Sequence, residues 1–228
     1  MLKKACKLLK TGYEYAMALV FTPLCCCCGD SVPVGEYICP MCEDMLEDLK
    51  LDTIRHVRRG GRTYDLVGVY RYSNDNVATK CVKRLKFNGE LSCSRYMGLK
   101  VGEKAAKMKR EFDYVTSVPM TVSKEMKRGY NQAEYIADFA AQKLGLKYLR
   151  TLKKRFNNYE QHTLSGSDRL RNVSGCYRAI RNVKGKKILL VDDVITTGNT
   201  IAEAANTLYE AGADDVAIIS FAMVKSGH

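Results

Sequence analysis

A buried strand followed at once by two acids is the feature that most constrains this chain. Ile188 to Val191 is an uninterrupted apolar run, typical of a parallel strand covered on both faces. Asp192 and Asp193 follow at its predicted end, and ligands of open α/β sheets bind at that carboxyl edge. The pattern predicts an α/β fold with a mainly parallel twisted sheet and a binding site at the acids.

The turn after the acids is rich in hydroxyl groups and opens a helix. It consists of Thr196, Thr197, Gly198, Asn199 and Thr200. Backbone N–H groups at a helix start, with hydroxyls beside them, can hold a phosphate dianion, and glycine lets the backbone approach closely. The alternative is an ordinary strand-to-helix turn with two solvated acids and a threonine N-cap. Because strand, acids and turn occur together in this order, we favour a sugar-phosphate site.

The charge balance favours anionic partners. Lys and Arg number 37 against 25 Asp and Glu in 228 residues, a formal net charge of +12. This suits phosphorylated substrates or nucleic acid, although a basic surface that only aids solubility is the simpler interpretation. An arginine-rich turn around Gly60 and Gly61 could contact an anion, or could simply be solvated. The chain lacks the Gly-x-x-x-x-Gly-Lys-Ser/Thr loop of P-loop ATPases.

No stretch near the start predicts a membrane anchor. The apolar patch at 16–21 is too short to cross a bilayer, and no convincing signal-cleavage site follows it. We expect a short amphipathic helix that leads into the cysteines, no integral membrane segment, and a cytoplasmic protein.

Two Cys-x-x-Cys pairs, Cys25 with Cys28 and Cys39 with Cys42, predict a metal site. Four thiolates at this spacing can surround zinc tetrahedrally at about 2.3 Å. Any two of the four consecutive cysteines 25–28 can serve in principle. A redox dithiol needs only one such pair, and thiols packed in a core are the other alternative. We favour a closed zinc site, which would stabilise the fold and not catalyse.

Cations stand beside two predicted helix ends. After a strand near 112–118, a loop is predicted from Met120 to Lys127, and Arg128 to Gln132 open the next predicted helix. Lys124 and Arg128 concentrate positive charge here, suited to a pyrophosphate. Surface lysines beside a helix cap are the alternative. Lys86 ends a helix predicted from Asn76 onward, where it either lies over a substrate pocket or caps its own helix.

Several of these motifs together carry a family resemblance. The strand, acids and Thr-Thr-Gly turn resemble the phosphoribosyl-pyrophosphate motif of type I phosphoribosyltransferases. With the paired cysteine knuckles, the chain resembles the ComF family of competence-associated, amidophosphoribosyltransferase-like proteins from Cys25 onward. Three further motifs support this resemblance: Lys86 to Gly89, Arg128 to Gln132, and Gln161 to Ser165 followed by Arg169 and Asn172. It departs at Lys124, where the family usually carries arginine.

The resemblance implies a chemistry and its residues. Asp192 and Asp193 would contact the ribose with Mg²⁺ nearby, and residues 196–200 would hold the 5′-phosphate. Arg128 would neutralise the leaving pyrophosphate, and Arg169 would close over the site. The implied reaction is displacement at the anomeric carbon of phosphoribosyl pyrophosphate by an unknown acceptor. The alternative is a single-stranded DNA-binding competence protein, with or without other competence partners, whose sugar-phosphate site is not catalytic.

The chain is expected to divide into two parts. Residues 1–45 would form an N-terminal helix and a zinc-ribbon-like module, and residues 46–228 a phosphoribosyltransferase-like domain. Its strands are predicted near 112–118, 146–151, 187–192 and 214–222, with helices on both faces of the sheet.

Overall fold

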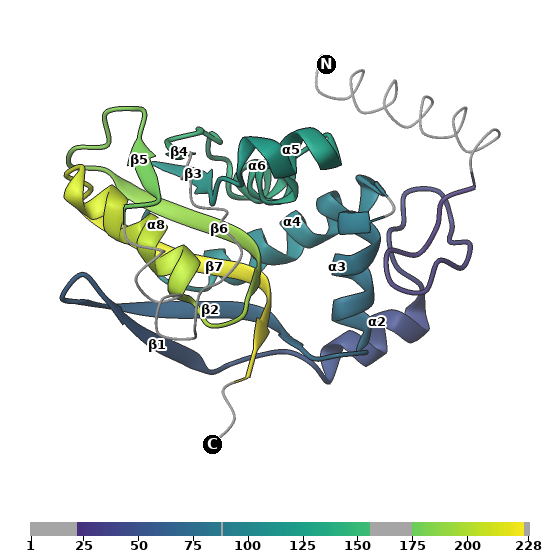
Figure 1. The fold of residues 1–228 in the computed structure, drawn as a ribbon. Coiled ribbons are helices and arrows are strands. Elements are labelled where there is room, and N and C mark those ends of the chain that lie inside the picture. Colours follow the sequence, from purple (N-terminus) through teal and green to yellow (C-terminus); the bar gives the residue numbers. More distant parts are fainter. Residues whose placement is uncertain (1–21, 88, 156–174, 226–228) are drawn as a thin grey trace, which may run out of the picture.

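A mainly parallel sheet forms the centre of the protein (Figure 1), whose computed structural model describes residues 22–87, 89–155 and 175–225. Its strand order is β1-β2-β7-β6-β3. The bounds are β1 Ile54–Arg59, β2 Arg62–Tyr72, β3 Tyr114–Ser117, β6 Lys187–Ile195 and β7 Asp215–Val224. Neighbouring strands pair in parallel except β1, which is antiparallel to β2. The predicted fold class is confirmed.

Helices cover both faces of this sheet. They are α2 Pro40–Glu47, α3 Val77–Phe87, α4 Ser92–Ala106, α5 Val122–Arg128, α6 Gln132–Leu144 and α8 Asn199–Glu210. Side chains of β6 alternate between two apolar clusters, as strand geometry requires. Leu189 and Val191 pack in the cluster that contains α3, α4 and α6, whereas Ile188 and Leu190 pack in the cluster that contains α8. The continuous apolar run of β6 therefore reflects burial on both faces.

The segment before α6 differs from the prediction of an irregular loop. Thr121 caps the short helix α5 by accepting a hydrogen bond from Lys124 N through its hydroxyl, and Gly129 ends α5 with φ of 84°. Asn131 then caps α6 through Ala133 N. The N-cap Thr121 and the C-cap Gly129 therefore turn the expected loop into the short helix α5.

The strand predicted near 146–151 does not form as a strand of the main sheet. Tyr148 makes a single bridge to Val115 of β3, and the chain then turns away. Two short strands, β4 Leu152–Lys154 and β5 Tyr177–Ala179, pair antiparallel as a separate sheet. This second sheet places new side chains at the carboxyl edge of the main one.

The arginine-rich turn is an ordered β1–β2 hairpin that packs against α8. Arg59 Nε donates to Glu203 at 2.7 Å, and the Arg62 guanidinium lies 4.7 Å from the centroid of the Tyr209 ring. Arg59 and Arg62 therefore have partners inside the fold, so the anion contact that the sequence allowed for this turn is not needed to explain them.

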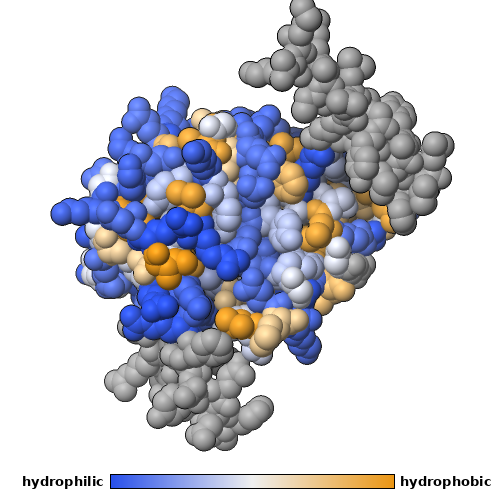
Figure 2. Space-filling model, turned by 90° about the horizontal axis from the view of Figure 1, so that it is seen from above, coloured by the Kyte–Doolittle hydropathy of each residue, from blue (hydrophilic) through white to orange (hydrophobic). Residues whose placement is uncertain are grey.

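The surface offers little continuous apolar area on the face seen in Figure 2, which is mainly hydrophilic with small separate hydrophobic patches. Within the part of the chain that the structure describes, no helix is both long and apolar enough to cross a membrane. Cys25, Cys26 and Cys27 belong to the same apolar cluster as α3 and α4. The division of the chain at residue 45 stays a prediction.

Candidate functional site

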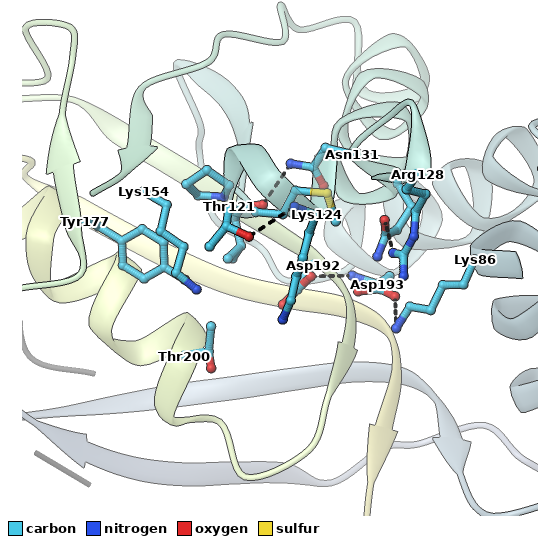
Figure 3. A pocket seen from close by; sticks show the side chains of 14 residues that line it. Lys86, Thr121, Lys124, Arg128, Asn131, Lys154, Tyr177, Asp192, Asp193 and Thr200 are labelled. Carbon is cyan, nitrogen blue, oxygen red and sulfur yellow. Dashed lines mark hydrogen bonds and ion pairs between the residues drawn. The ribbon is translucent and has the colours of Figure 1, made fainter. Parts of the chain in front are cut away.

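A pocket of about 290 Å³ opens at the carboxyl edge of the sheet (Figure 3). We call it the acid-pair pocket. Six of the residues singled out in the sequence line it: Lys86, Lys124, Arg128, Asp192, Asp193 and Thr200. They come from α3, α5, β6 and α8, so the fold brings together side chains that are far apart in the chain.

The acids lie where β6 loses one neighbour. β3 pairs with β6 as far as Val191, whose carbonyl accepts the last hydrogen bond from Val118 N at 3.0 Å. On the other side β7 remains paired with β6 up to Ile195. The strand therefore continues past the end predicted at Asp192, because β7 still supports it. The missing neighbour on the β3 side leaves room for a ligand beside the acids.

The two carboxylates have different surroundings. Asp193 is 6% exposed, and its Oδ2 lies 2.5 Å from Lys86 Nζ, although Oδ2 accepts no hydrogen bond of good geometry within the described chain. Asp192 is half-buried, and its Oδ1 accepts a hydrogen bond from Asp193 N at 2.8 Å. Burial, and then the neighbouring Asp193 carboxylate, raise the pKa of Asp192 well above its usual value.

The hydroxyl-rich turn follows directly and starts α8. Its N-cap is Gly198, in the left-handed region with φ of 86°. A Cβ at this position would lie 2.4 Å from Leu66 Cδ1, so only glycine fits here. Thr200 lines the acid-pair pocket, whereas residues 196–199 lie beyond its lining. Thr196 and Thr197 are exposed, so their side chains are accessible to a ligand.

The opposite wall carries the cations of α5, Lys124 and Arg128. Arg128 Nη1 donates to Gln132 Oε1 at 2.7 Å, which fixes the guanidinium beside the acids. Asn131 Nδ2 donates to Val118 O at 3.2 Å and so ties the start of α6 to the end of β3. This wall therefore holds its charge in a fixed position relative to the sheet.

Two pocket residues with ionisable side chains were missed by sequence reasoning. Lys154 of β4 and Tyr177 of β5 line the acid-pair pocket, with the ammonium 5.7 Å from the ring centroid. Burial lowers the pKa of Lys154, aided by Lys124 and opposed by the charges of Cys176 and Asp192. Burial, and then Asp192, raise the pKa of Tyr177. The basic run 153–155 was the available signal. Arg169 lies outside the described residues, as do Gln161 to Ser165 and Asn172.

The four predicted zinc ligands converge. The Sγ atoms of Cys25, Cys28, Cys39 and Cys42 all lie within 4.8 Å of one another, and the cluster could hold a metal ion. Cys28 and Cys39 Sγ are 3.7 Å apart. Metal–sulfur bonds of about 2.3 Å at tetrahedral angles give about 3.8 Å between sulfurs, so the cluster fits zinc. Cys39 N and Cys27 N donate to Cys25 Sγ at 3.4 Å, as is common around thiolate ligands.

Of cysteines 25–28, the geometry groups Cys25 and Cys28 with Cys39 and Cys42. Cys26 and Cys27 are buried and lie outside the four-cysteine cluster. Cys26 instead accepts a contact from Cys93 Sγ at its carbonyl oxygen, 3.8 Å away. Cys26 therefore packs against the start of α4, and both cysteines lie in the apolar cluster that contains α3 and α4.

Comparison with known proteins places the chain in a family. Competence protein ComFC of Streptococcus pneumoniae is 30% identical to this chain over 226 residues, which cover 94% of this chain and 98% of the relative. The chain belongs to the ComF family. DNA utilization protein YhgH of Salmonella typhimurium is 27% identical over 208 residues, covering 89% of this chain and 91% of the relative.

This ComF-family chain also matches a general domain model. Residues 127–228 match the phosphoribosyl transferase domain, and this region contains β6, the acids and the turn. Among solved structures, the chain is similar to glutamine phosphoribosylpyrophosphate (PRPP) amidotransferase from B. subtilis, at 28% identity and a TM-score of 0.39. The match covers 55% of this chain and spans a quarter of the amidotransferase.

Proposed function

We propose that this protein binds phosphoribosyl pyrophosphate with Mg²⁺ in the acid-pair pocket and transfers its phosphoribosyl group to an acceptor. The observation that carries the proposal is the convergence of Asp192, Asp193 and Thr200 with the cations of α5 in one pocket. The match of residues 127–228 to the phosphoribosyl transferase domain supports it. In this arrangement the acids face the ribose, and the 5′-phosphate and the pyrophosphate of the donor lie against opposite walls of the pocket.

Each wall suits one part of the donor. Exposed hydroxyls of Thr196 and Thr197, with N–H groups at the start of α8, offer donors to the 5′-phosphate. Lys124 and Arg128 offer positive charge to the pyrophosphate, which leaves with the electron pair of the C1–O bond. Asp192 and Asp193 stabilise the positive charge that develops on the ribose. Catalysis then rests on orientation and electrostatics.

The acid pair is suited to a magnesium ion shared with the donor. Asp192 Oδ1 is engaged by Asp193 N, which leaves the second oxygen available as a hard ligand. Mg²⁺ usually binds through one or two carboxylates together with substrate phosphates. When bound, it would supply charge neutralisation for the leaving pyrophosphate.

We further propose that the four-cysteine cluster holds zinc with a structural role. Four thiolates fill a tetrahedral site and leave no open position for a substrate. The cluster lies beside α3, which carries Lys86 into the acid-pair pocket. A bound zinc would therefore also stabilise the helix that completes the pocket.

Turnover tests the transferase directly. Release of pyrophosphate from labelled phosphoribosyl pyrophosphate is followed while nucleobases, ammonia and amines are offered in turn. Acceptor-dependent release that disappears when Asp192 and Asp193 are changed to asparagine supports the proposal. Release that is equal in the wild type and the double variant would refute catalysis at these acids.

A second candidate is binding of single-stranded DNA. The net charge of +12 favours it, as do the names of relatives such as DNA utilization protein YhgH. Phosphate contacts by lysine and arginine make DNA affinity fall steeply with salt. If the affinity for a single-stranded oligonucleotide does not change with salt concentration, the electrostatic argument for DNA binding fails.

A further inference from the structure

A larger cavity of about 580 Å³ adjoins the acid-pair pocket. Lys86, Lys124 and Arg128 line both and therefore form the wall between them. Lys127, Phe87 and Tyr130 line the larger space and not the smaller. We call this space the Phe87 cavity. Its position places any occupant next to the proposed donor.

The side chains that line the Phe87 cavity offer hydrogen-bond donors and positive charge. Four of its side chains are lysine or arginine, which have no acceptor atoms. Tyr130 already donates its hydroxyl to Leu85 O. Among the described side chains of this lining there is no carboxylate and no amide. Lys124 and Lys127 have no carboxylate partner within the described chain, so their charge is available to a ligand.

An exposed aromatic ring completes the lining. Phe87 is 74% exposed, which is unusual for a phenyl ring on a folded surface. The Arg128 guanidinium lies 6.0 Å from its centroid, at the outer limit of a cation–π contact. Much of the ring is left for a planar ligand, which would bury apolar surface against it.

This lining excludes several kinds of occupant. Ammonium ions and protonated amines would be repelled by four cations. A neutral nucleobase presents both donors and acceptors, and among the described side chains of the lining only the Tyr130 hydroxyl oxygen could accept a hydrogen bond from its donors. A planar ring that carries carboxylate groups matches both the donors and the phenyl face.

We propose that the Phe87 cavity binds the acceptor and that the acceptor is a small aromatic carboxylate. This inference rests on the proposed transferase function of the acid-pair pocket. The acceptor's nucleophilic atom gives an electron pair to ribose C1 while the C1–O bond to pyrophosphate breaks. Pyrophosphate leaves with the pair from that bond, and any proton on the nucleophile passes to solvent.

Titration calorimetry with phthalate as the probe tests the site. The wild type binds phthalate at a single site, whereas Lys127→Gln weakens it about tenfold through loss of one charge-assisted contact. Phe87→Leu weakens it about fivefold and Phe87→Tyr leaves it within about twofold, since the ring is what the site requires. Lys80→Gln, an exposed lysine on the same helix, serves as the matched control and leaves phthalate affinity unchanged.

Further probes separate the alternatives. Benzamide, which has the ring without the charge, binds at least about tenfold more weakly than phthalate. Equal binding of the two, or phthalate affinity insensitive to both Phe87→Leu and Lys127→Gln, overturns the proposal. The proposal is also overturned if Phe87→Leu lowers the affinity for pyrophosphate as much as the affinity for phthalate, because the cavity is then a general anion site. Oligothymidylate binding that depends on Phe87, without phthalate binding, assigns the cavity to DNA instead.

Failure of the donor proposal gives a different result. Phe87 and Lys127 lie outside the acid-pair pocket, so their variants keep wild-type affinity for Mg²⁺ and phosphoribosyl pyrophosphate. If phthalate binds as expected and phosphoribosyl pyrophosphate does not bind at all, the transferase function fails and the cavity remains an aromatic acid site. If the wild type binds phosphoribosyl pyrophosphate normally and does not bind phthalate, only the cavity proposal is refuted.

Discussion

Lys86 Nζ lies 2.5 Å from Asp193 Oδ2, so the end of α3 supplies the counter-charge for a buried acid of β6. Both side chains are largely removed from water, at 24% and 8% exposure. The neighbouring carbonyl of Leu85 accepts a hydrogen bond from the Tyr130 hydroxyl, which fixes the same helix end to the start of α6. The end of α3 thus joins β6 and the start of α6, two of the other segments around the acid-pair pocket.

Removing this counter-charge should cost stability. Lys86→Met leaves the Asp193 carboxylate buried without an ionic partner, and we expect a loss of about 2 kcal/mol in the free energy of unfolding. Urea denaturation measures it. Combining Lys86→Met with Asp193→Asn should recover most of the loss, because the uncompensated charge is then gone. A single variant as stable as the exposed control Lys80→Met would show that the pair contributes nothing.

The turn at the start of α8 should tolerate no side chain at Gly198. Gly198→Ala combines a left-handed backbone with a clash against Leu66, and we expect a loss of about 3 kcal/mol in unfolding free energy. Gly185 has φ of 68°, and a Cβ added there would meet no atom within 4 Å, so Gly185→Ala should lose only about 1 kcal/mol. Thermal unfolding compares the two. Equal losses would mean that the close approach to Leu66 is relieved without cost.

Metal content should identify the cysteine ligands. We expect about one zinc per chain by elemental analysis, lost in Cys39→Ser and retained in Cys27→Ala, which lies outside the cluster. Chelation of the metal should lower the melting temperature, because a bound metal stabilises the folded state. Full zinc content in Cys39→Ser together with zinc loss in Cys27→Ala would reverse the assignment of ligands.

Anion binding beside Lys154 should take up a proton at pH values between the pKa of this lysine before binding and its pKa after binding. Burial lowers the pKa of this lysine, and a bound anion favours the ammonium and raises the pKa again. Pyrophosphate affinity is therefore fully present below the lowered pKa and declines as pH rises through the interval up to the raised value. Calorimetry in buffers of different ionisation enthalpy measures the uptake, which should shrink in Lys154→Met. Unchanged uptake in this variant would exclude Lys154 as its source.

How much could be predicted from the sequence depends on the range of the interactions involved. Local signals predicted β6, the turn and the two cysteine pairs correctly, because apolar runs, glycine and ligand spacing act within a few residues. The continuation of β6 to Ile195 was missed because it depends on pairing with β7, a partner that comes later in the chain. Lys154 and Tyr177 were missed because their hairpin depends on long-range pairing of β4 with β5. The roles assigned to the site residues stay predictions.

The most direct test of the central claim is calorimetric titration of phosphoribosyl pyrophosphate with Mg²⁺. The account predicts saturable binding to the wild type and to Asp214→Asn, a control for an exposed acid beside the start of β7, at the opposite end of the sheet from the pocket. It predicts no measurable binding to the variant in which Asp192 and Asp193 are both asparagine. Affinity in that double variant equal to the wild type would contradict the assignment of the acid-pair pocket.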